Sequence, residues 1–563
     1  MIFGSITKST TFLLFAASTI FAQEKISPEL ANVQPGTSLD VIIQYKSAPT
    51  GFHRQQMGRR GGKLRHELGL VRALAYTVPQ EALASLESDP EVASVTPDHI
   101  VSATAVSGVS HVYETADVLT ATQAGYTGSG VTVAVIDSGI QWDHPDLAGR
   151  VVYSQNFVPT ATTAYDQYGH GTHVAGIIGG LPVNYNTTTY KFAFPGVGPL
   201  VRLVNLRVLD QNGQGSDSAV IAAIQQAIAL RNTYGIRVIN LSLGRTIQQS
   251  YKTDPLCQAV EAAWKAGIVV VVAAGNGGRD DSAGTNGYGT ITAPGNDPYV
   301  ITVGAMKDMG TPSRNDDQMA SYSSKGPTLL DHVAKPDLVA PGNRVISTIY
   351  NAPTLVTTYP ANAVPVSLYL NNPAGASIST VYFQLSGTSM ATPVVAGAAA
   401  LLFEKNPGLT PDQVKAILMK TATKSFPAVT TATDPTTGQT YTTYYDLFTV
   451  GAGYVDVWAA LNDNDAYPSG YTSMSPVVQP NSSKTGISLV TASNVVWGSN
   501  VVWGSNVVWG SNVVWGSNVV WGSNVVWGSS SVAGFNVVWG SNVVWGSTTA
   551  QGESSSVAIN GEN

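Results

Sequence analysis

Cysteine is almost absent from this sequence: Cys257 is the only one in 563 residues, so no disulfide can form within the chain. Cys257 lies in an amphipathic stretch, residues 254–267, which predicts a small buried side chain on a helix rather than a nucleophile. Charge is also scarce, at 12% of residues, with a formal net charge of −7. A nucleic-acid-binding protein needs a basic surface, so this composition argues against nucleic acid as a partner.

The chain also lacks any uninterrupted apolar run of about 18 residues, so we expect no transmembrane segment. A shorter apolar run, residues 11–22, follows Lys8 and ends in small residues. This pattern is typical of a secretory signal peptide that is cleaved after Ala22. We therefore expect residues 1–22 to be removed, and the protein to be secreted and either extracellular or associated with the cell surface.

Two segments with different patterns follow the leader. Residues 38–105 combine extended runs with helical stretches, one of which begins at Pro79, and this predicts a small α+β domain. From Val131 onward, continuous apolar runs rich in β-branched residues alternate with helical stretches. This alternation predicts a three-layer α/β domain over residues 106–462, with a parallel sheet covered on both faces. Ligands of such sheets bind beyond the carboxyl ends of the strands, so residues at those ends are candidates for chemistry.

Three polar residues stand out at such positions. Asp137 ends an extended run, His170 lies between two glycines, and Ser389 precedes an apolar helix whose first N–H groups can stabilise negative charge. Each has another explanation when taken alone. Asp137 could form a turn, His170 could be one half of a metal pair with His173, and Ser389 could cap its helix. Together, the order Asp, His, Ser in an α/β domain matches one of the convergent orders of serine proteases.

The sequences around these residues carry a resemblance to a known family. The segments VIDSGIQWDHPDL, GHGTHVAGIIG and SGTSMATPVVAGAAALL closely resemble the three signature motifs of subtilisin-like serine proteases, the subtilases, and the resemblance covers about residues 104–461. It implies a subtilisin-like fold and a serine endopeptidase that forms an acyl-enzyme. Ser389 is then the nucleophile, His170 the base, and Asp137 the group that orients the imidazole. His173 is then structural.

The resemblance also implies the remaining parts of the site. The side chain of Asn276 and the backbone N–H of Ser389 are expected to bind the oxyanion. Arg245 stands where relatives often have glycine, so we expect its side chain at the rim of the primary specificity pocket. Two segments are expected to pair with an extended peptide substrate: Gly213, Gln214 and Gly215, and Ser242, Leu243 and Gly244.

The regions before and around the main domain carry further expectations. Residues 38–105 resemble the family's inhibitory propeptide, which implies an autoprocessed zymogen cleaved near residues 103–110. The expected partners are protein or peptide substrates and the chain's own propeptide, and the chemistry requires no cofactor. Asp146 matches an acidic position that often helps to bind structural calcium. However, the long segment 181–200 offers Asn184 and Asn186 but no acid, which argues against a standard calcium site. A polar insertion, residues 351–380, is expected to form an extended flap near the cleft.

The C-terminal region consists of repeats. A Pro- and Ser-rich linker is expected over residues 463–493, followed at 494–547 by hexads that read NVVWGS with one degenerate copy. Glycine in every hexad opposes a helix, so the repeat is expected to be β-like or disordered, and residues 548–563 are expected to be disordered. The hexads contain no acid, base or histidine, so they are not catalytic; a cell surface, an extracellular matrix or the repeat itself are the candidate ligands.

Two rival functions differ in kind. In the first, the repeat is the working part of an adhesive protein, and the protease domain is inactive. In the second, His170 and His173 hold a metal ion in a hydrolase, although the H-E-x-x-H pattern is missing.

Overall fold

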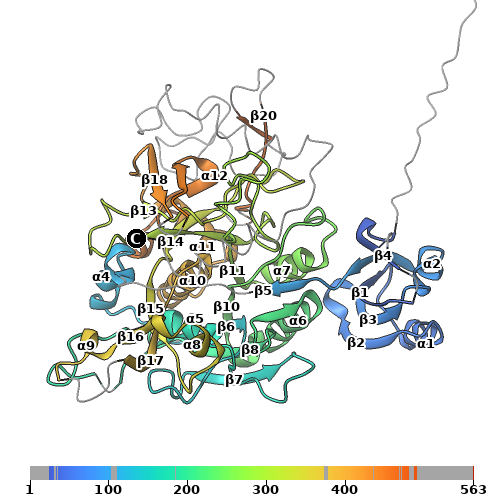
Figure 1. Ribbon diagram of the computed structural model, residues 1–563, viewed down its shortest axis with the longest axis horizontal. Helices are drawn as coiled ribbons and strands as arrows, with labels where there is room; N and C mark the ends of the chain where they lie inside the picture. The colour runs from blue at the N-terminus through green and yellow to red at the C-terminus, as the bar shows by residue number, and fades with distance from the viewer. Residues whose placement is uncertain are drawn as a thin grey trace, which may run out of the picture.

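The computed structural model describes residues 25–30, 33–34, 36–102, 111–183, 185–372, 378–434, 437–467, 470, 472–480, 487–490 and 562. The expected signal peptide, the expected cleavage segment 103–110, Asn184 and the NVVWGS repeats lie outside these residues. The described residues form two parts, an N-terminal domain over residues 25–102 and a main domain over residues 111–480 (Figure 1).

The N-terminal domain is the predicted small α+β unit. Its antiparallel sheet has the order β2-β3-β1-β4. β1 carries apolar side chains on both faces, and the two faces join different cores. Val41 and Ile43 pack inside the domain, whereas Ile42 joins the core of the main domain. The elements are η1 (Pro28–Leu30), β1 (Ser38–Tyr45), α1 (Gly51–Arg59), β2 (Lys63–Leu68), η2 (Gly69–Val71), β3 (Ala73–Pro79), α2 (Ala82–Glu87), β4 (Val92–Pro97) and β5 (Ile100–Ser102).

The main domain is built on an eight-stranded sheet with the order β13-β12-β11-β10-β6-β8-β7, in which β14 also pairs with β12. All its strand pairs are parallel except β12 with β13. The predicted α/β architecture with a parallel sheet is therefore confirmed. The strands are β6 (Thr132–Asp137), β7 (Val151–Asn156), β8 (Arg202–Arg207), β10 (Ile236–Leu241), β11 (Val269–Ala273), β12 (Ile301–Lys307), β13 (Gln318–Met319) and β14 (Leu338–Pro341).

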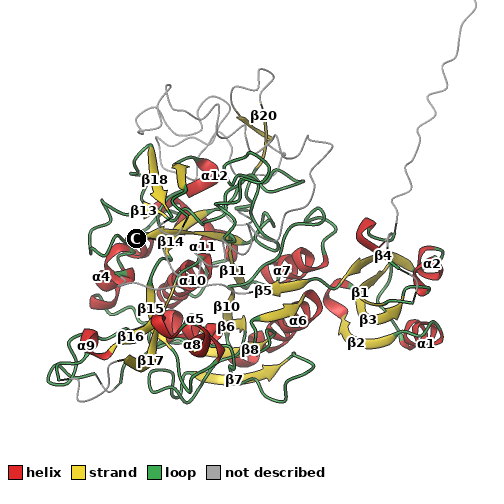
Figure 2. Ribbon diagram, in the orientation of Figure 1, coloured by secondary structure: helices red, strands yellow, loops and turns green. Residues whose placement is uncertain are grey.

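Helices cover both faces of this sheet (Figure 2). α5 (His170–Gly179) packs against α10 (Thr388–Lys405), and α6 (Asp217–Tyr234) packs against α7 (Pro255–Lys265). α6 and α7 begin where the sequence offers caps. Ser216 accepts a hydrogen bond from the Ala219 N–H, and Asp254 accepts one from the Leu256 N–H. Cys257 is fully buried in α7, as predicted.

The other elements surround this core. They are α3 (Val112–Thr115), α4 (Val118–Gln123), β9 (Gln214–Ser216), β15 (Val345–Thr348), α8 (Thr354–Thr358), η3 (Pro360–Asn362), β16 (Ala363–Pro365), α9 (Val366–Tyr369), β17 (Ile378–Leu385), α11 (Pro411–Thr421), β18 (Val429–Thr433), β19 (Thr440–Tyr444), α12 (Leu447–Val450), α13 (Val457–Leu461), β20 (Val477–Pro480) and β21 (Ile487–Val490).

Three regions differ from the expectations. The insertion 351–380 forms short helices, β16 and the start of β17 instead of an extended flap, because Val364, Val366 and Tyr369 pack into a small core with Tyr382 of β17. Residues 472–480, expected to be linker, pack on the main domain. There the Ser475 hydroxyl donates to the Asp337 carboxylate at 2.5 Å. Glu562, in the stretch expected to be disordered, is buried.

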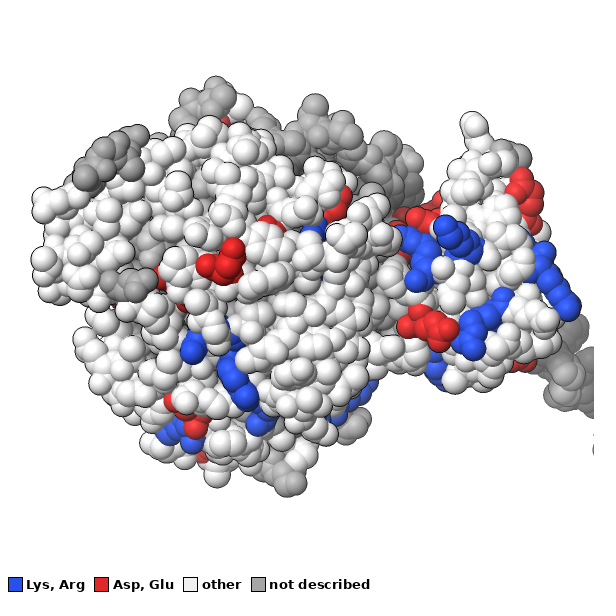
Figure 3. Space-filling view, turned by 90° about the horizontal axis from the view of Figure 1, so that it is seen from below, with Lys and Arg blue, Asp and Glu red and all other residues white. Residues whose placement is uncertain are grey.

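The surface is unevenly charged. Figure 3 shows charged side chains dense on the N-terminal domain and sparse over the visible face of the main domain. Among the residues that the structure describes, every helix is too short or too polar to cross a membrane.

Candidate active site

Asp137 and His170 meet at the carboxyl end of β6. Asp137 is the last residue of that strand, and His170 is the first residue of α5. The Nδ1 atom of His170 lies 2.8 Å from Oδ1 of Asp137, and both residues are fully buried. A carboxylate in this place fixes the Nδ1–H tautomer, which leaves Nε2 as the basic nitrogen.

A second carboxylate, which the sequence analysis missed, holds the start of α5. Asp166 is fully buried and accepts hydrogen bonds from the N–H groups of Gly169 and Thr172, at 2.8 and 2.9 Å. It also accepts one from the hydroxyl of Ser138, the neighbour of Asp137, at 2.9 Å. Burial raises the pKa of Asp166, although these donors oppose the shift. An acid four residues before His170 was the available signal, and its role depends on contacts that spacing alone does not reveal.

Ser389 lies in the first turn of α10, beside the segment that follows β10. Its hydroxyl donates to the carbonyl of Ser242 at 3.0 Å, and its own carbonyl accepts from the Ser242 hydroxyl at 2.8 Å. His170 Nε2 has no hydrogen-bond partner among the described residues. Ser389 thus lies on a helix that packs against α5, the helix that begins at His170, and its hydroxyl is bonded to Ser242. Catalytic hydrogen bonds often form only when substrate binds.

Asn276 follows β11 and is oriented by Thr388. Its Oδ1 atom accepts from the backbone N–H and the hydroxyl of Thr388, at 3.0 and 3.1 Å. The Thr388 hydroxyl also accepts from the Gly275 N–H at 3.1 Å. Because Oδ1 faces Thr388, the Nδ2 amide group faces the other way. Asn276 thus has a fixed orientation next to the nucleophile candidate Ser389.

The first predicted substrate segment forms an edge strand. β9 contains Gln214 and Gly215, and it pairs antiparallel with β5 of the N-terminal domain, with Val101 opposite Gly215. Gly213 precedes it with φ +73°, and a Cβ there would lie 2.5 Å from the ring of Tyr168. This position therefore requires glycine.

The second predicted segment, Ser242, Leu243 and Gly244, follows β10 beside Ser389, but Arg245 behaves differently from the expectation. Its guanidinium does not line the rim of a pocket. It is buried, with Nε 2.8 Å from Asp217 and Nη2 2.8 Å from Asp254. The two acids stand at the N-terminal ends of α6 and α7, and Arg245 joins them because a buried cation needs acidic partners.

Replacing Arg245 by methionine is expected to destabilise the protein by about 3–5 kcal/mol, because two buried carboxylates lose their shared cation. Urea unfolding in a Ser389→Ala background, which prevents self-digestion, measures this loss. Arg202→Met, an exposed arginine at the start of β8, is the control and is expected to change stability by less than about 0.5 kcal/mol. Equal stability of the two variants would contradict a structural role for Arg245.

His173 does not form a site with His170. Its Nε2 atom lies 3.1 Å from the carbonyl oxygens of Val345 and Phe383, and since carbonyls only accept, Nε2 carries the proton. Burial, reinforced by the neighbouring His170, lowers the pKa of His173 to about 3. The two imidazoles therefore serve different partners. Within the described part of the chain, no three His, Cys, Asp or Glu side chains gather in a set that could hold a metal ion.

Asp146, the calcium candidate, is engaged by the insertion. Its Oδ2 atom accepts from the Tyr382 hydroxyl of β17 at 2.6 Å, and burial raises the pKa of the carboxyl group. One oxygen of the candidate ligand is thus occupied by a phenol.

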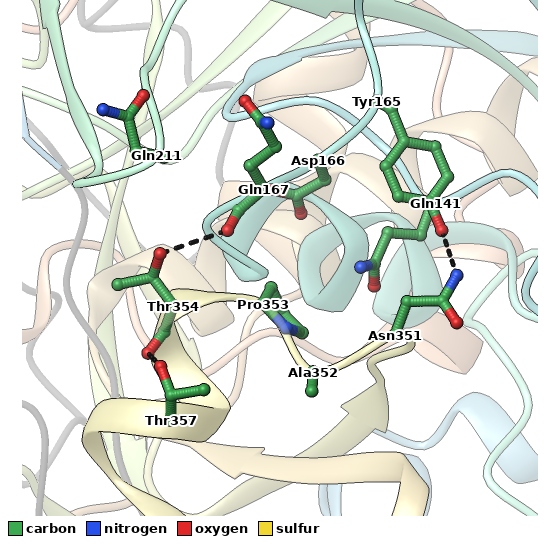
Figure 4. A pocket seen from close by; sticks show the side chains of 10 residues that line it. All are labelled: Gln141, Tyr165, Asp166, Gln167, Gln211, Asn351, Ala352, Pro353, Thr354 and Thr357. Atoms are coloured by element: carbon green, nitrogen blue, oxygen red, sulfur yellow. Dashed lines mark hydrogen bonds between the residues drawn. The ribbon is translucent and has the colours of Figure 1, made fainter.

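An open polar cavity of about 480 Å³ lies beside the segment that precedes His170 (Figure 4). The insertion forms one wall, because the Thr354 N–H donates to the Gln167 carbonyl at 3.0 Å. Gly169 is needed for this packing: its φ is +106°, and a Cβ would lie 2.8 Å from Pro353. The cavity is lined by Gln141, Tyr165, Asp166, Gln167, Gln211, Asn351, Ala352, Pro353, Thr354 and Thr357.

Comparisons with known proteins give the class and then the family. The chain is a serine-type endopeptidase: it is 37% identical over 413 residues to Serine protease AprX of Bacillus subtilis (strain 168), covering 69% of this chain and 83% of that protein. Subtilisin E of the same organism is 36% identical over 422 residues, covering 73% and 92%. The sequence profile of the subtilase family matches residues 128–439. This chain belongs to the subtilase family.

A solved structure supports the fold. The crystal structure of fervidolysin from Fervidobacterium pennivorans, described as a keratinolytic enzyme related to subtilisin, aligns with a TM-score of 0.55 and 22% sequence identity. The alignment covers 76% of this chain and 61% of that chain. At this identity the likeness concerns the fold alone.

Proposed function

We propose that this endopeptidase is secreted as a zymogen and cleaves peptide bonds with Asp137, His170 and Ser389 as its catalytic triad. The observation that carries the proposal is the 2.8 Å contact between Asp137 and His170 at the end of β6, with Ser389 in the first turn of the neighbouring helix α10. Asp137 keeps the proton on Nδ1, so Nε2 of His170 is available as a base.

Catalysis then proceeds in two stages. The Ser389 hydroxyl first changes its hydrogen-bond acceptor from the Ser242 carbonyl to Nε2 of His170. It then gives its proton to Nε2, and its oxygen attacks the substrate carbonyl. The oxyanion is stabilised by the Asn276 amide and the Ser389 N–H. His170 returns the proton to the leaving amine, and water, activated by the same imidazole, then hydrolyses the acyl-enzyme. All these groups belong to the protein, so the chemistry uses no cofactor.

The N-terminal domain is proposed to be the inhibitor of the same chain. β5 lies antiparallel along β9, the edge strand proposed to receive an extended substrate, so it occupies that site. The domain is also held at the start of α6, where the Ser218 N–H donates to Asp98 at 2.6 Å and the Asp217 N–H donates to the His99 carbonyl at 2.9 Å.

The N-terminus of the secreted protein tests the zymogen proposal. The secreted wild-type protein is expected to begin within residues 103–110, whereas Ser389→Ala, which cannot cleave itself, is expected to keep the N-terminal domain. Intact mass spectrometry of both secreted proteins gives the result. A Ser389→Ala protein that is trimmed at the same position in a host free of other proteases would contradict self-processing.

The contact between the domains is expected to depend on pH. Burial and the charge of Arg245 lower the pKa of His99. The hydrogen bond to Asp217 and the charges of Asp217 and Glu29 raise it by more, so the pKa of His99 is raised overall. A raised pKa means that His99 stabilises the precursor fully below its unfolded pKa of about 6.5 and loses this effect as pH rises through the folded pKa.

Urea unfolding of the Ser389→Ala precursor measures this effect. The stability of the His99 protein relative to His99→Gln is expected to fall as pH rises from acid through neutral. His66 is the control, because its contribution to stability is expected to change with pH in the opposite direction. Burial and the Arg65 charge lower the pKa of His66, so its stabilising effect is lost as pH falls. A His99 effect that does not change with pH would contradict the pairing with Asp217.

A further inference from the structure

Glu562, the second-last residue of the chain, lies inside the main domain with its side chain 3% exposed. Its Oε1 atom accepts from Arg279 Nη2 at 3.0 Å and from the Ser321 N–H at 2.9 Å, and it also contacts the Ser321 hydroxyl. Lys307 Nζ lies 3.2 Å from Oε2. The carboxylate thus meets two cations and a backbone donor.

The backbone of Glu562 is held as well. Its N–H donates to Oδ1 of Asn343 at 3.3 Å, and Nδ2 of Asn343 donates to the Glu562 carbonyl at 3.2 Å. One asparagine amide therefore makes both hydrogen bonds of this residue's backbone, as a neighbouring strand would. The pocket thus binds Glu562 by its main chain and its side chain together.

The walls of the pocket suit an anion. The side chains of Arg279 and Lys307 are 5% and 4% exposed. Arg279 is further fixed by Asp434 at 2.7 Å and by the Ser321 hydroxyl at 2.6 Å. Buried cations require acidic partners or pay a large desolvation cost, so a carboxylate in this position stabilises the fold.

The segment that leads to Glu562 also starts from the main domain. Val477 of β20 forms a bridge with Val333, and Val490 of β21 pairs with Val477. Val490 and Glu562, which flank the repeats at 494–547, are therefore both held on the main domain.

We propose that Arg279, Lys307, Ser321 and Asn343 form a carboxylate-binding pocket whose ligand is Glu562 of the same chain. The main domain then binds the chain both before the repeats, at β20 and β21, and after them, at Glu562. A single cut in the repeats then leaves the C-terminal piece bound to the main domain without a covalent link. This holds whether or not the N-terminal domain acts as an inhibitor.

Hydrogen exchange tests the pocket in the full-length chain carrying Ser389→Ala. In Glu562→Ala, the Ser321 amide loses its acceptor, so its exchange is expected to accelerate by about tenfold or more. The melting temperature is expected to fall by about 5 °C, because Arg279 and Lys307 lose the Glu562 carboxylate, while Asp434 still pairs with Arg279. Glu553→Ala removes the same charge nine residues earlier in the tail and is expected to match the parent in both measurements.

Glu562→Gln keeps an acceptor oxygen but removes the charge. It is expected to retain much of the Ser321 protection while still lowering the melting temperature, which separates the hydrogen bond from the ion pairs. Equal behaviour of Glu562→Ala and Glu553→Ala would overturn the proposal. So would a Ser321 protection that rises with protein concentration, since the ligand would then come from a second copy of the chain.

Discussion

Replacing Ser389 by alanine is expected to reduce peptide hydrolysis by about 10⁶-fold, the factor found in subtilisin itself, a member of this family. The large effect is expected because Ser389, at the start of α10, is the proposed nucleophile, and without its hydroxyl no acyl-enzyme can form. Hydrolysis of a peptide substrate and covalent labelling by a fluorophosphonate are the measurements. Both signals are expected to disappear, whereas the circular dichroism spectrum stays the same.

Ser386→Ala provides a matched control. This buried serine lies three residues before Ser389, and its hydroxyl accepts from the Arg344 N–H at 2.7 Å. Labelling and hydrolysis are expected to remain within about tenfold of wild type, as for a change outside the reacting groups. Equal labelling of wild type and Ser389→Ala would show that another residue is the nucleophile. Chelator-sensitive activity that survives the fluorophosphonate would favour the metal-hydrolase rival.

Replacing Asn276 by leucine is expected to lower kcat by about 10²–10³-fold with little change in KM; this range comes from the corresponding asparagine of subtilisin. The amide interacts with charge that develops only in the transition state, so ground-state binding is largely unaffected. Steady-state kinetics with one peptide substrate separates the two constants. A rise in KM at constant kcat would contradict an oxyanion role.

Thr388→Val serves as the companion variant. Its hydroxyl bonds to Asn276 Oδ1 and to the Gly275 N–H, but its backbone N–H still reaches Oδ1 after the change. A smaller loss of kcat, about tenfold, is expected, because the amide is still held by one of its two bonds. A Thr388→Val loss as large as that of Asn276→Leu would mean that the threonine acts by itself.

Sequence patterns predicted the strands and helices that depend on residues close together in the sequence. Continuous apolar runs marked the buried strands β6 and β11, and the chemistry-bearing residues Asp137 and Asn276 follow from where those strands end. The helix start at Ser389 was visible in the same way. The class of enzyme and the parallel sheet are confirmed, while the roles of these side chains remain predictions until the variants are measured.

Contacts between distant segments could not be predicted. Arg245 was expected at a pocket rim, but it is bonded to Asp217 and Asp254, which its own sequence neighbourhood does not indicate. Asp146 faces a tyrosine 236 residues further along the chain, and Glu562 reaches a serine 241 residues before it. Such pairings depend on the tertiary fold, since buried charges and phenols bond to whatever partner the packing brings near.

The position of Asp217 bears on the proposed removal of the N-terminal domain. Its carboxylate lies 3.3 Å from His99 Nδ1 on one side and 2.8 Å from Arg245 on the other. If the N-terminal domain is removed as proposed, Asp217 loses His99 but keeps its ion pair with Arg245, so its carboxylate is still paired with a cation. Because Arg245 also pairs with Asp254, the starts of α6 and α7 would then carry one cation for two carboxylates, and the positive charge of His99 would be the part that is lost.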